Sequence, residues 1–320
     1  MITSFITHPY CALHYMGPEH PENPQRLEAI SARLSLAGLL QQTMQADAKE
    51  ASQEDLARVH PSRHLRALKD CVPHENIVML NDDTLMNPDS LKAAAMAAGA
   101  ALRGVDQVFR HQADNVFCAV RPPGHHAEAA GTMGFCFYNN VAVAAAYARE
   151  KYAARRIAIL DFDVHQCNGT IDIFKQDPDI LICTSFQSPF YPWRYLHDEH
   201  HNVVNTPLEA GSNGEVFREA IEKQWLPALH AFKPELVLLS SGFDAHRDDP
   251  MSEIRLDDSD FYWVTRLAMD IATQYADNRL VSVLEGGYHL ESLASATEAH
   301  LKALLGHPFE PPTQVYGPGK

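Results

Sequence analysis

The chain has 320 residues, with 26 basic and 41 acidic side chains and a formal net charge of −15. This balance argues against a nucleic-acid-binding protein, which needs a basic face. It is compatible with a cationic partner, such as a lysine-rich tail or a polyamine, and equally with a surface kept acidic for solubility. No apolar run approaches the roughly eighteen residues of a membrane span, and the N-terminus has no signal-peptide pattern, so we expect a cytoplasmic protein without a membrane contact.

The first third of the chain combines one strand with several helices. A glycine follows the first helix, and the third is rich in alanine, the strongest helix former. The predicted elements are, in chain order, a strand at Ile2–Ile6 and helices at Pro24–Ala37, Ala57–Asp70 and Leu91–Phe109.

From residue 115 onwards, apolar strands alternate with amphipathic helices. The expected strands are Asn115–Val120, Ile157–Asp161, Ile180–Ser185, Leu236–Ser241 and Leu280–Leu284. The expected helices are Asn140–Tyr152, a short one near Ile171, Val216–Phe232, Ser259–Tyr275 and Leu290–Leu305. This alternation is typical of a parallel sheet with helices on both faces. We predict one α/β domain over residues 1–320, with an irregular tail from about residue 307.

Polar clusters follow four of these strands directly. In parallel sheets, ligands bind outside the carboxyl ends of the strands, so we expect these clusters to meet at one edge. Without a shared function, their carboxylates would be buried at a cost of several kcal/mol each. The clusters are His125 and His126, then Asp161, Asp163 and His165, then Asp244, and finally Tyr288.

Asp163 and His165 are two residues apart in an extended segment, so their side chains point the same way and suit one metal ion. Asp244 would supply a third ligand. Three protein ligands of O, N and O type leave a position for water, which is typical of a catalytic zinc site. Fe²⁺ fits the same set. The alternative for Asp163 and His165 is a simple ion pair at the end of a strand.

Two adjacent histidines suit acid–base chemistry when their partners differ. One imidazole would take a proton from water, and the other, held against a carboxylate such as Asp161, would stay positive. Tyr288 follows two glycines and would donate a hydrogen bond to an oxyanion, although a buried core tyrosine would give the same pattern.

The motifs together resemble the zinc-dependent histone deacetylase family, which shares its fold with arginases. The similarity runs through nearly the whole chain and is greatest to bacterial and class II-like members. It is carried by Pro21–Leu27, Arg121–Ala127, Gly134–Asn140, Asp161–His165, Gly242–His246 and Glu285–Tyr288. The implied fold is an arginase/deacetylase-like domain with about eight strands.

The resemblance also implies roles for individual residues. Asp163, His165 and Asp244 would bind zinc, His126 would be the general base and acid, and Asn168 would be its partner. His125 would pair with Asp161, and Tyr288 would stabilise the tetrahedral intermediate. The wall of an acyl-lysine tunnel would be formed by Gly134, Phe135 and Tyr191. A structural monovalent cation, usually K⁺, would be held by Asp161, Asp163, His165, Ser185 and Phe186.

Three positions depart from the family pattern. The residues after the ligand histidine are Gln166 and Cys167, where the family usually has His and Gly. A cysteine costs about 1 kcal/mol there if the backbone φ is positive, and its thiol would be a possible oxidation or zinc-competing site. Met251 stands where polyamine-selective relatives carry a glutamate, which argues against a polyamine preference.

The sequence therefore predicts a hydrolase that uses metal-activated water to remove acetyl or acyl groups from Nε-acyl-lysine of proteins or peptides. One alternative is a small-molecule deacylase acting on an acylamine such as an acetylpolyamine. Another is a weakly active acyl-lysine-binding protein, and a two-manganese arginase-type enzyme ranks third. The natural substrate, the acyl preference and the oligomeric state are not readable from the sequence.

Overall fold

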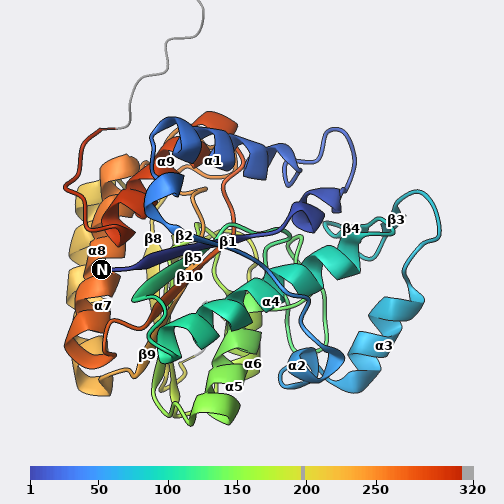
Figure 1. Cartoon of the computed structure of the whole chain (residues 1–320), viewed down its shortest axis with the longest axis horizontal. Helices are drawn as coiled ribbons and strands as arrows, with labels where there is room; N and C mark the ends of the chain where they lie inside the picture. The colour runs from blue at the N-terminus through green and yellow to red at the C-terminus, as the bar shows by residue number, and fades with distance from the viewer. Residues whose placement is uncertain (196–198, 312–320) are drawn as a thin grey trace, which may run out of the picture.

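The computed structural model describes residues 1–195 and 199–311, and its centre is one eight-stranded sheet (Figure 1). The strand order is β2-β1-β5-β10-β9-β6-β7-β8, and every neighbouring pair is parallel. The strands are β1 Thr3–Thr7, β2 Met44–Asp47, β5 Asn115–Cys118, β6 Ile157–Asp161, β7 Ile180–Gln187, β8 Val203–Leu208, β9 Leu236–Ser241 and β10 Leu280–Leu284. A separate antiparallel pair joins β3 Val78–Met79 to β4 Leu85–Met86.

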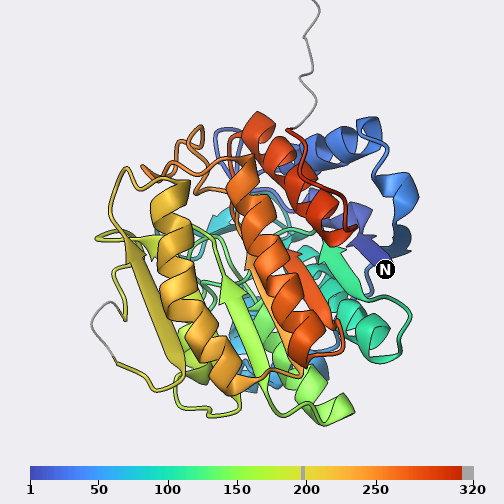
Figure 2. The same cartoon turned by 90° about the vertical axis from the view of Figure 1, so that its left-hand side faces the viewer.

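Helices cover both faces of the sheet, as the alternating pattern predicted. Helices α1, α7, α8 and α9 form one layer and α4 and α5 the other, and Figure 2 shows α7, α8 and α9 in front of the strands. The helices are α1 Gln25–Leu36, α2 Gln53–Ala57, α3 Ser62–Asp70, α4 Ser90–Phe109, α5 Asn140–Tyr152, α6 Asn168–Phe174, α7 Gly214–Phe232, α8 Asp258–Tyr275 and α9 Leu290–Leu304.

The two edge strands carry no clear signal in the sequence. The four residues of β2 are largely exposed and three of them are polar or short, and β8 contains Pro207, a residue that is common only at sheet edges. The predicted helix at Ala57–Asp70 is wrong in its first turn, because α2 ends at Ala57 and α3 begins after Pro61. Residues 307–311 form no helix or strand, and the rest of the predicted tail lies outside the described residues.

A parallel sheet places the carboxyl ends of all its strands at one edge. Asp161 at the end of β6 pairs with Ser240 of β9 and Thr184 of β7, and Ser241 pairs with Leu284 of β10. The loops that follow these strands therefore begin side by side. This arrangement brings together residues far apart in the chain, such as Gly124 and Glu285, which are 161 positions apart and share a hydrogen bond.

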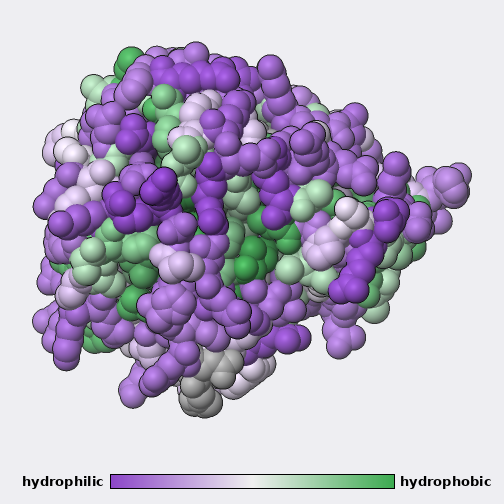
Figure 3. Space-filling view, turned by 90° about the horizontal axis from the view of Figure 1, so that it is seen from below, coloured by the Kyte–Doolittle hydropathy of each residue, from purple (hydrophilic) through white to green (hydrophobic). Residues whose placement is uncertain are grey.

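The surface seen from below is mainly hydrophilic, and apolar residues gather around recesses near its middle (Figure 3). Within the described residues, no helix combines the length and hydropathy that a membrane span requires.

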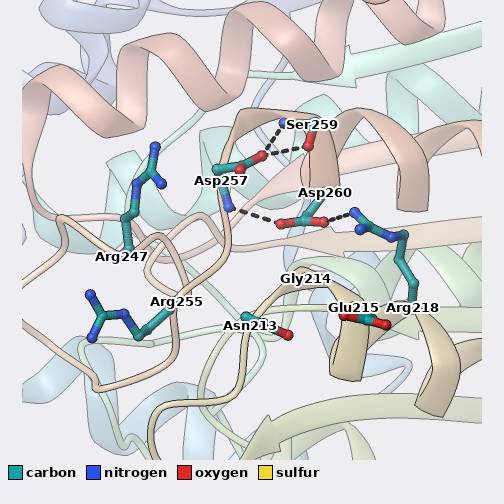
Figure 4. Close-up of a pocket in the computed structure, with 9 residues that line it drawn as sticks. All are labelled: Asn213, Gly214, Glu215, Arg218, Arg247, Arg255, Asp257, Ser259 and Asp260. Carbon is teal, nitrogen blue, oxygen red and sulfur yellow. Dashed lines mark hydrogen bonds and ion pairs between the residues drawn. The ribbon is translucent and has the colours of Figure 1, made fainter.

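The N-terminus of α8 is capped by Asp257, in a polar pocket that Figure 4 shows in close-up. The carboxylate of Asp257 accepts hydrogen bonds from the N–H and the hydroxyl of Ser259 at 2.9 and 2.5 Å. In return, the Asp257 N–H donates to Asp260, whose carboxylate also binds Arg218. Asp257 and Asp260 are thus both engaged in hydrogen bonds or ion pairs within the fold.

The substitution Asp257→Ala is expected to lower the free energy of unfolding by about 1 kcal/mol, because it leaves backbone N–H groups of the first turn without an acceptor. Chemical denaturation of both proteins measures the difference. The matched control is Asp270→Ala on the same helix, where the side chain is 74% exposed and the change should stay below about 0.5 kcal/mol. Equal losses in the two variants would contradict the capping role.

Candidate metal centre

Asp163, His165 and Asp244 lie together at the carboxyl edge of the sheet. Each offers one ligand atom, and these atoms all lie within 4.8 Å of one another. Nδ1 of His165 is 3.0 Å from Oδ1 of Asp163 and 3.1 Å from Oδ2 of Asp244. All three side chains are buried. Two carboxylates and an imidazole around one point form a set of O, N and O donors of the kind that binds Zn²⁺ or Fe²⁺.

The negative charge of the two buried carboxylates would be balanced better by a bound metal cation than by a proton on Asp244. Oδ2 of Asp244 is buried and accepts no aligned hydrogen bond from any group that the structure describes, although Nδ1 of His165 is only 3.1 Å away. Such an oxygen is costly to bury without a partner. Burial and the charge of Asp163 raise the pKa of Asp244 to about 6. A bound cation would offset the repulsion between the two carboxylates, and it would give Oδ2 of Asp244 the partner that this oxygen lacks among the described residues.

The remaining oxygens of the two carboxylates are held by the backbone. Asp163 Oδ2 accepts from the Gly286 N–H at 2.8 Å, and Asp244 Oδ1 accepts from the Val164 N–H at 2.9 Å. A Cβ on Gly286 would lie 2.2 Å from Asp244 Oδ2 and 2.5 Å from Asp163 Oδ2, so only glycine fits there. The first glycine of the Glu285–Tyr288 motif thus has a packing reason, since it allows the backbone to approach both candidate ligands.

The two adjacent histidines have different partners and opposite pKa shifts. Nδ1 of His125 is 3.0 Å from Oδ2 of Asp161, and the charges of Asp163 and Asp161 overcome burial and raise the pKa of His125 well above its usual range. Nδ1 of His126 is 2.6 Å from Oδ1 of Asn168. Burial and the neighbouring charges of His125 and His165 hold the pKa of His126 well below its usual range. At neutral pH, one ring is therefore charged and the other neutral.

A cavity of about 240 Å³ opens onto this centre. Its lining contains every residue predicted for the acyl-lysine tunnel, together with two that the sequence did not indicate, Asp83 and Phe190. The lining residues are Asp83, His126, Gly134, Phe135, His165, Phe190, Tyr191, Met251 and Tyr288. Gly134 has φ +56°, and a Cβ there would lie 2.2 Å from the His126 ring, so glycine keeps this wall against the candidate base.

The carboxylate of Asp83 connects two segments of the cavity lining through hydrogen bonds. Its Oδ1 accepts from the Gly134 N–H at 3.0 Å, and its Oδ2 accepts from the Tyr191 hydroxyl at 2.7 Å. The Tyr191 ring stands edge-on to the rings of His126 and His165, with centroids 5.2 and 5.8 Å away. Tyr191 therefore packs against two histidines of the centre. The sequence contains no sign of its hydrogen bond to Asp83, since 108 residues separate the two.

Glu285 is a buried residue of the site for which the sequence analysis predicted no role. Its Oε2 accepts from the N–H groups of Gly124 and His125 at 2.7 and 3.1 Å, and its Oε1 accepts from the Ser240 hydroxyl at 3.1 Å. Burial raises its pKa to about 7. The carboxyl group fixes the backbone that carries the two histidines.

A buried ion-pair network supports Tyr288 from behind. Arg26 lies over the Tyr288 ring at 4.9 Å and donates to the Gly287 and Glu285 carbonyls at 2.6 and 2.5 Å. Glu22 binds both Arg26 and Arg121. Glu22 and Arg26 belong to the motif Pro21–Leu27, and Arg121 begins the motif Arg121–Ala127. The sequence did not indicate that these two motifs contact each other.

Cys167 does not have the strained backbone considered from the sequence. Its φ is −76°, so its Cβ carries no left-handed penalty. The thiol is fully buried, and burial raises its pKa well above the usual range, which disfavours both oxidation and metal binding. The converging ligand atoms found among the described residues do not include it.

Three of the five residues expected to hold a monovalent cation, Asp161, Ser185 and Phe186, lie on neighbouring strands, and the other two, Asp163 and His165, follow the end of β6. Asp161 ends β6 and pairs with Thr184 of β7, and Ser185 and Phe186 are the next residues of β7. All three are buried.

Comparison with known proteins gives one consistent family. The family model described as "Histone deacetylase domain" matches residues 20–304. The chain is 40% identical over 298 residues to uncharacterized protein slr0245 of Synechocystis, covering 91% of this chain and 96% of that protein. It is 33% identical to a histone deacetylase-like amidohydrolase of Pseudomonas aeruginosa, covering 89% and 81%.

Two further matches extend this similarity. The chain is 34% identical to the human polyamine deacetylase HDAC10, covering 91% of this chain and 45% of that protein. Among solved structures, the HDA15 HD domain superimposes with a TM-score of 0.88 at 31% identity, covering 96% of this chain and 90% of that chain.

Proposed function

The chain belongs to the histone deacetylase family, with a bacterial class II-like pattern, and from this premise we propose that it is a zinc-dependent hydrolase of Nε-acyl-lysine in proteins or peptides. The observation that carries the proposal is the convergence of Asp163, His165 and Asp244 at the base of a cavity. The cavity walls, the neutral His126 and the hydroxyl-bearing Tyr288 supply the other parts that hydrolysis of an amide needs.

The three candidate ligands would hold one divalent cation, with Zn²⁺ favoured and Fe²⁺ as the second choice. When bound, such an ion polarises a carbonyl and lowers the pKa of water to about 7. The buried, otherwise unpartnered Oδ2 of Asp244 supports this assignment.

His126 acts as the general base and then the general acid. Its Nδ1 faces Asn168, so its Nε2 is the nitrogen left to take a proton from the attacking water and return it to the leaving amine. The low pKa of His126 keeps this nitrogen unprotonated at neutral pH. His125 remains positively charged against Asp161 and offsets the negative charge that develops in the transition state.

Tyr288 donates its hydroxyl proton in a hydrogen bond to the oxyanion, and Arg26 behind the ring holds it in place. Gly134, Phe135 and Tyr191 pack along the aliphatic part of the acyl-lysine. A monovalent cation, with K⁺ favoured, would be held by the Asp161, Ser185 and Phe186 region beside the centre, where it would fix the segment that carries Asp163 and His165.

The substrate proposal favours acyl-lysine over an acetylpolyamine. The second candidate is supported by the similarity to a polyamine deacetylase. However, the side chain at position 251 of the cavity is an uncharged methionine, and the carboxylate of Asp83 already accepts from Tyr191 and Gly134. Recognition of a second, free cationic amine would need an unengaged carboxylate at the mouth.

We expect the zinc-loaded protein to release acetate from an acetyl-lysine peptide at least tenfold faster, in kcat/KM, than from acetylputrescine. Both reactions should stop when the metal is removed with a chelator and should recover when Zn²⁺ is returned. A panel of acyl chains on one peptide, with and without chelator, measures this. A preference for acetylputrescine would contradict the proposed acyl-lysine substrate. Undiminished turnover by the metal-free protein would contradict the proposed metal-dependent hydrolysis.

A further inference from the structure

A chain of side-chain contacts connects the candidate base His126 to the protein surface through Asn168, Glu128 and Arg194. Oδ1 of Asn168 lies 2.6 Å from Nδ1 of His126, and Nδ2 of Asn168 donates to Oε1 of Glu128 at 3.0 Å. The same oxygen of Glu128 lies 3.4 Å from Nε of Arg194, whose side chain is 52% exposed. His126 and Asn168 are buried, and the Glu128 side chain is 21% exposed.

Glu128 is held in this position by its own backbone and by α6. Its N–H donates to the Gly131 carbonyl at 3.0 Å, which closes a tight turn after the two histidines. The next N–H, that of Ala129, donates to Asp172 at 3.1 Å. Asn168 and Asp172 are four residues apart on α6, so they fall on one face of the helix and both bind the turn.

The surroundings of Asn168 permit only one orientation of its amide. Three atoms lie near Nδ2, the carboxylate of Glu128 at 3.0 Å, the carbonyl of His126 at 3.4 Å and the sulfur of Met133 at 3.4 Å. All three accept hydrogen bonds and none can donate one when Glu128 is ionised. A flipped amide would direct its oxygen at three acceptors, so Nδ2 must face Glu128 and Oδ1 must face His126.

This orientation decides which nitrogen of His126 carries the proton. Oδ1 of an amide is only an acceptor, so the Nδ1 facing it must be the N–H nitrogen of the neutral ring. Nε2 is then left with its lone pair. A general base needs a lone pair at the nitrogen that faces the reacting water, and the wrong tautomer would place a proton there instead.

We propose that Glu128 is a positioning residue that sets the tautomer of His126 through Asn168. This inference rests on the proposed function for its consequence, since a free Nε2 matters only if His126 is the base. The tautomer itself does not depend on activity, so it can be tested separately.

The first test is nitrogen NMR of protein labelled with ¹⁵N-histidine, in the zinc-loaded and metal-free forms. Two-bond proton–nitrogen correlations distinguish the two tautomers, and a His126→Gln sample assigns the signals of His126. We expect the Nδ1–H form in the wild type. Glu128→Lys replaces the carboxylate acceptor by an ammonium group that can only donate, which favours the flipped amide with Nδ2 toward His126, so the Nε2–H form should appear. An unchanged Nδ1–H form in this variant would overturn the proposal.

The second test is a swap that moves the carboxylate from position 128 to position 168. In the double variant Glu128→Lys, Asn168→Asp, the group facing His126 is a carboxylate that pairs with the new ammonium group, and a carboxylate accepts a hydrogen bond in either orientation. We expect Glu128→Lys alone to lower kcat by roughly 10- to 100-fold with KM within twofold. The swap should restore the Nδ1–H form and most of kcat. A swap that restores neither would show that Glu128 acts in another way.

Two controls separate the carboxylate–amide contact from its surroundings. Arg194→Met removes the ion pair of Glu128, and Asp172→Asn weakens the other attachment of the turn to α6. Both should keep the Nδ1–H form of His126. If Arg194→Met reproduces the tautomer change and the loss of kcat, the ion pair is responsible and the proposal is wrong. A wild type with the Nδ1–H form but no acyl-lysine turnover would refute the proposed function and leave this inference standing.

Discussion

His126→Ala is expected to lower kcat by roughly 10²- to 10⁴-fold, because it removes the only neutral imidazole that the described residues place between the candidate metal ligands and the cavity. Loss of the ring also removes the group that returns a proton to the leaving amine. The binding of the metal should not change, since His126 is not among the three converging ligands. Steady-state kinetics and metal analysis of the same samples measure the two effects.

The matched control for this variant is His111→Ala, because the His111 side chain is 70% exposed and lies before β5, whereas the candidate site lies after the strands end. It should retain the wild-type kcat. Added imidazole should partly restore the turnover of His126→Ala, because the deleted ring leaves space at the wall formed by Gly134. Wild-type turnover in His126→Ala would refute its role, whereas loss of bound metal would show that its ring helps to hold the centre.

Tyr288→Phe should lower kcat by roughly 10²- to 10³-fold, the usual cost of losing one hydrogen-bond donor to an oxyanion. The substitution keeps the ring, so the packing against Phe135 and Arg26 should remain. KM should change little, because the missing contact belongs to the transition state and not to the bound substrate. Steady-state kinetics with an acetyl-lysine peptide separates the two parameters.

The comparison variant is Tyr191→Phe, which also removes one hydroxyl from the wall of the cavity. That hydroxyl already donates to Asp83, so it is not available to an oxyanion. We expect this variant to change KM more than kcat. If Tyr191→Phe loses as much kcat as Tyr288→Phe, the assignment of the oxyanion donor to Tyr288 is contradicted.

The sheet could be predicted where its strands are buried on both faces. β6, β9 and β10 are fully buried apolar runs, and the sequence placed them correctly because such runs between amphipathic helices have few other interpretations. The edge strands β2 and β8 have one side open, so their composition is not constrained in this way. They depend on pairing with β1 and β7, which no local pattern reveals.

The candidate site shows the same division. Residues at the ends of buried strands, such as Asp163, Asp244 and Tyr288, could be expected to meet because parallel strands end at one edge. Asp83 and Phe190 could not, because they come from loops whose path over the cavity depends on contacts between distant segments. Glu285 and Glu128 stood in or beside the motifs, but their roles lie in hydrogen bonds to particular atoms, which spacing alone does not specify.

The most direct test of the metal centre is anomalous X-ray diffraction, at the zinc edge, from crystals of the protein purified with Zn²⁺. We predict one strong peak within about 2.0–2.3 Å of ligand atoms from Asp163, His165 and Asp244, with one coordination position left for water or substrate. A peak elsewhere, or an ion closed off by a fourth protein ligand, would contradict the proposed hydrolytic centre.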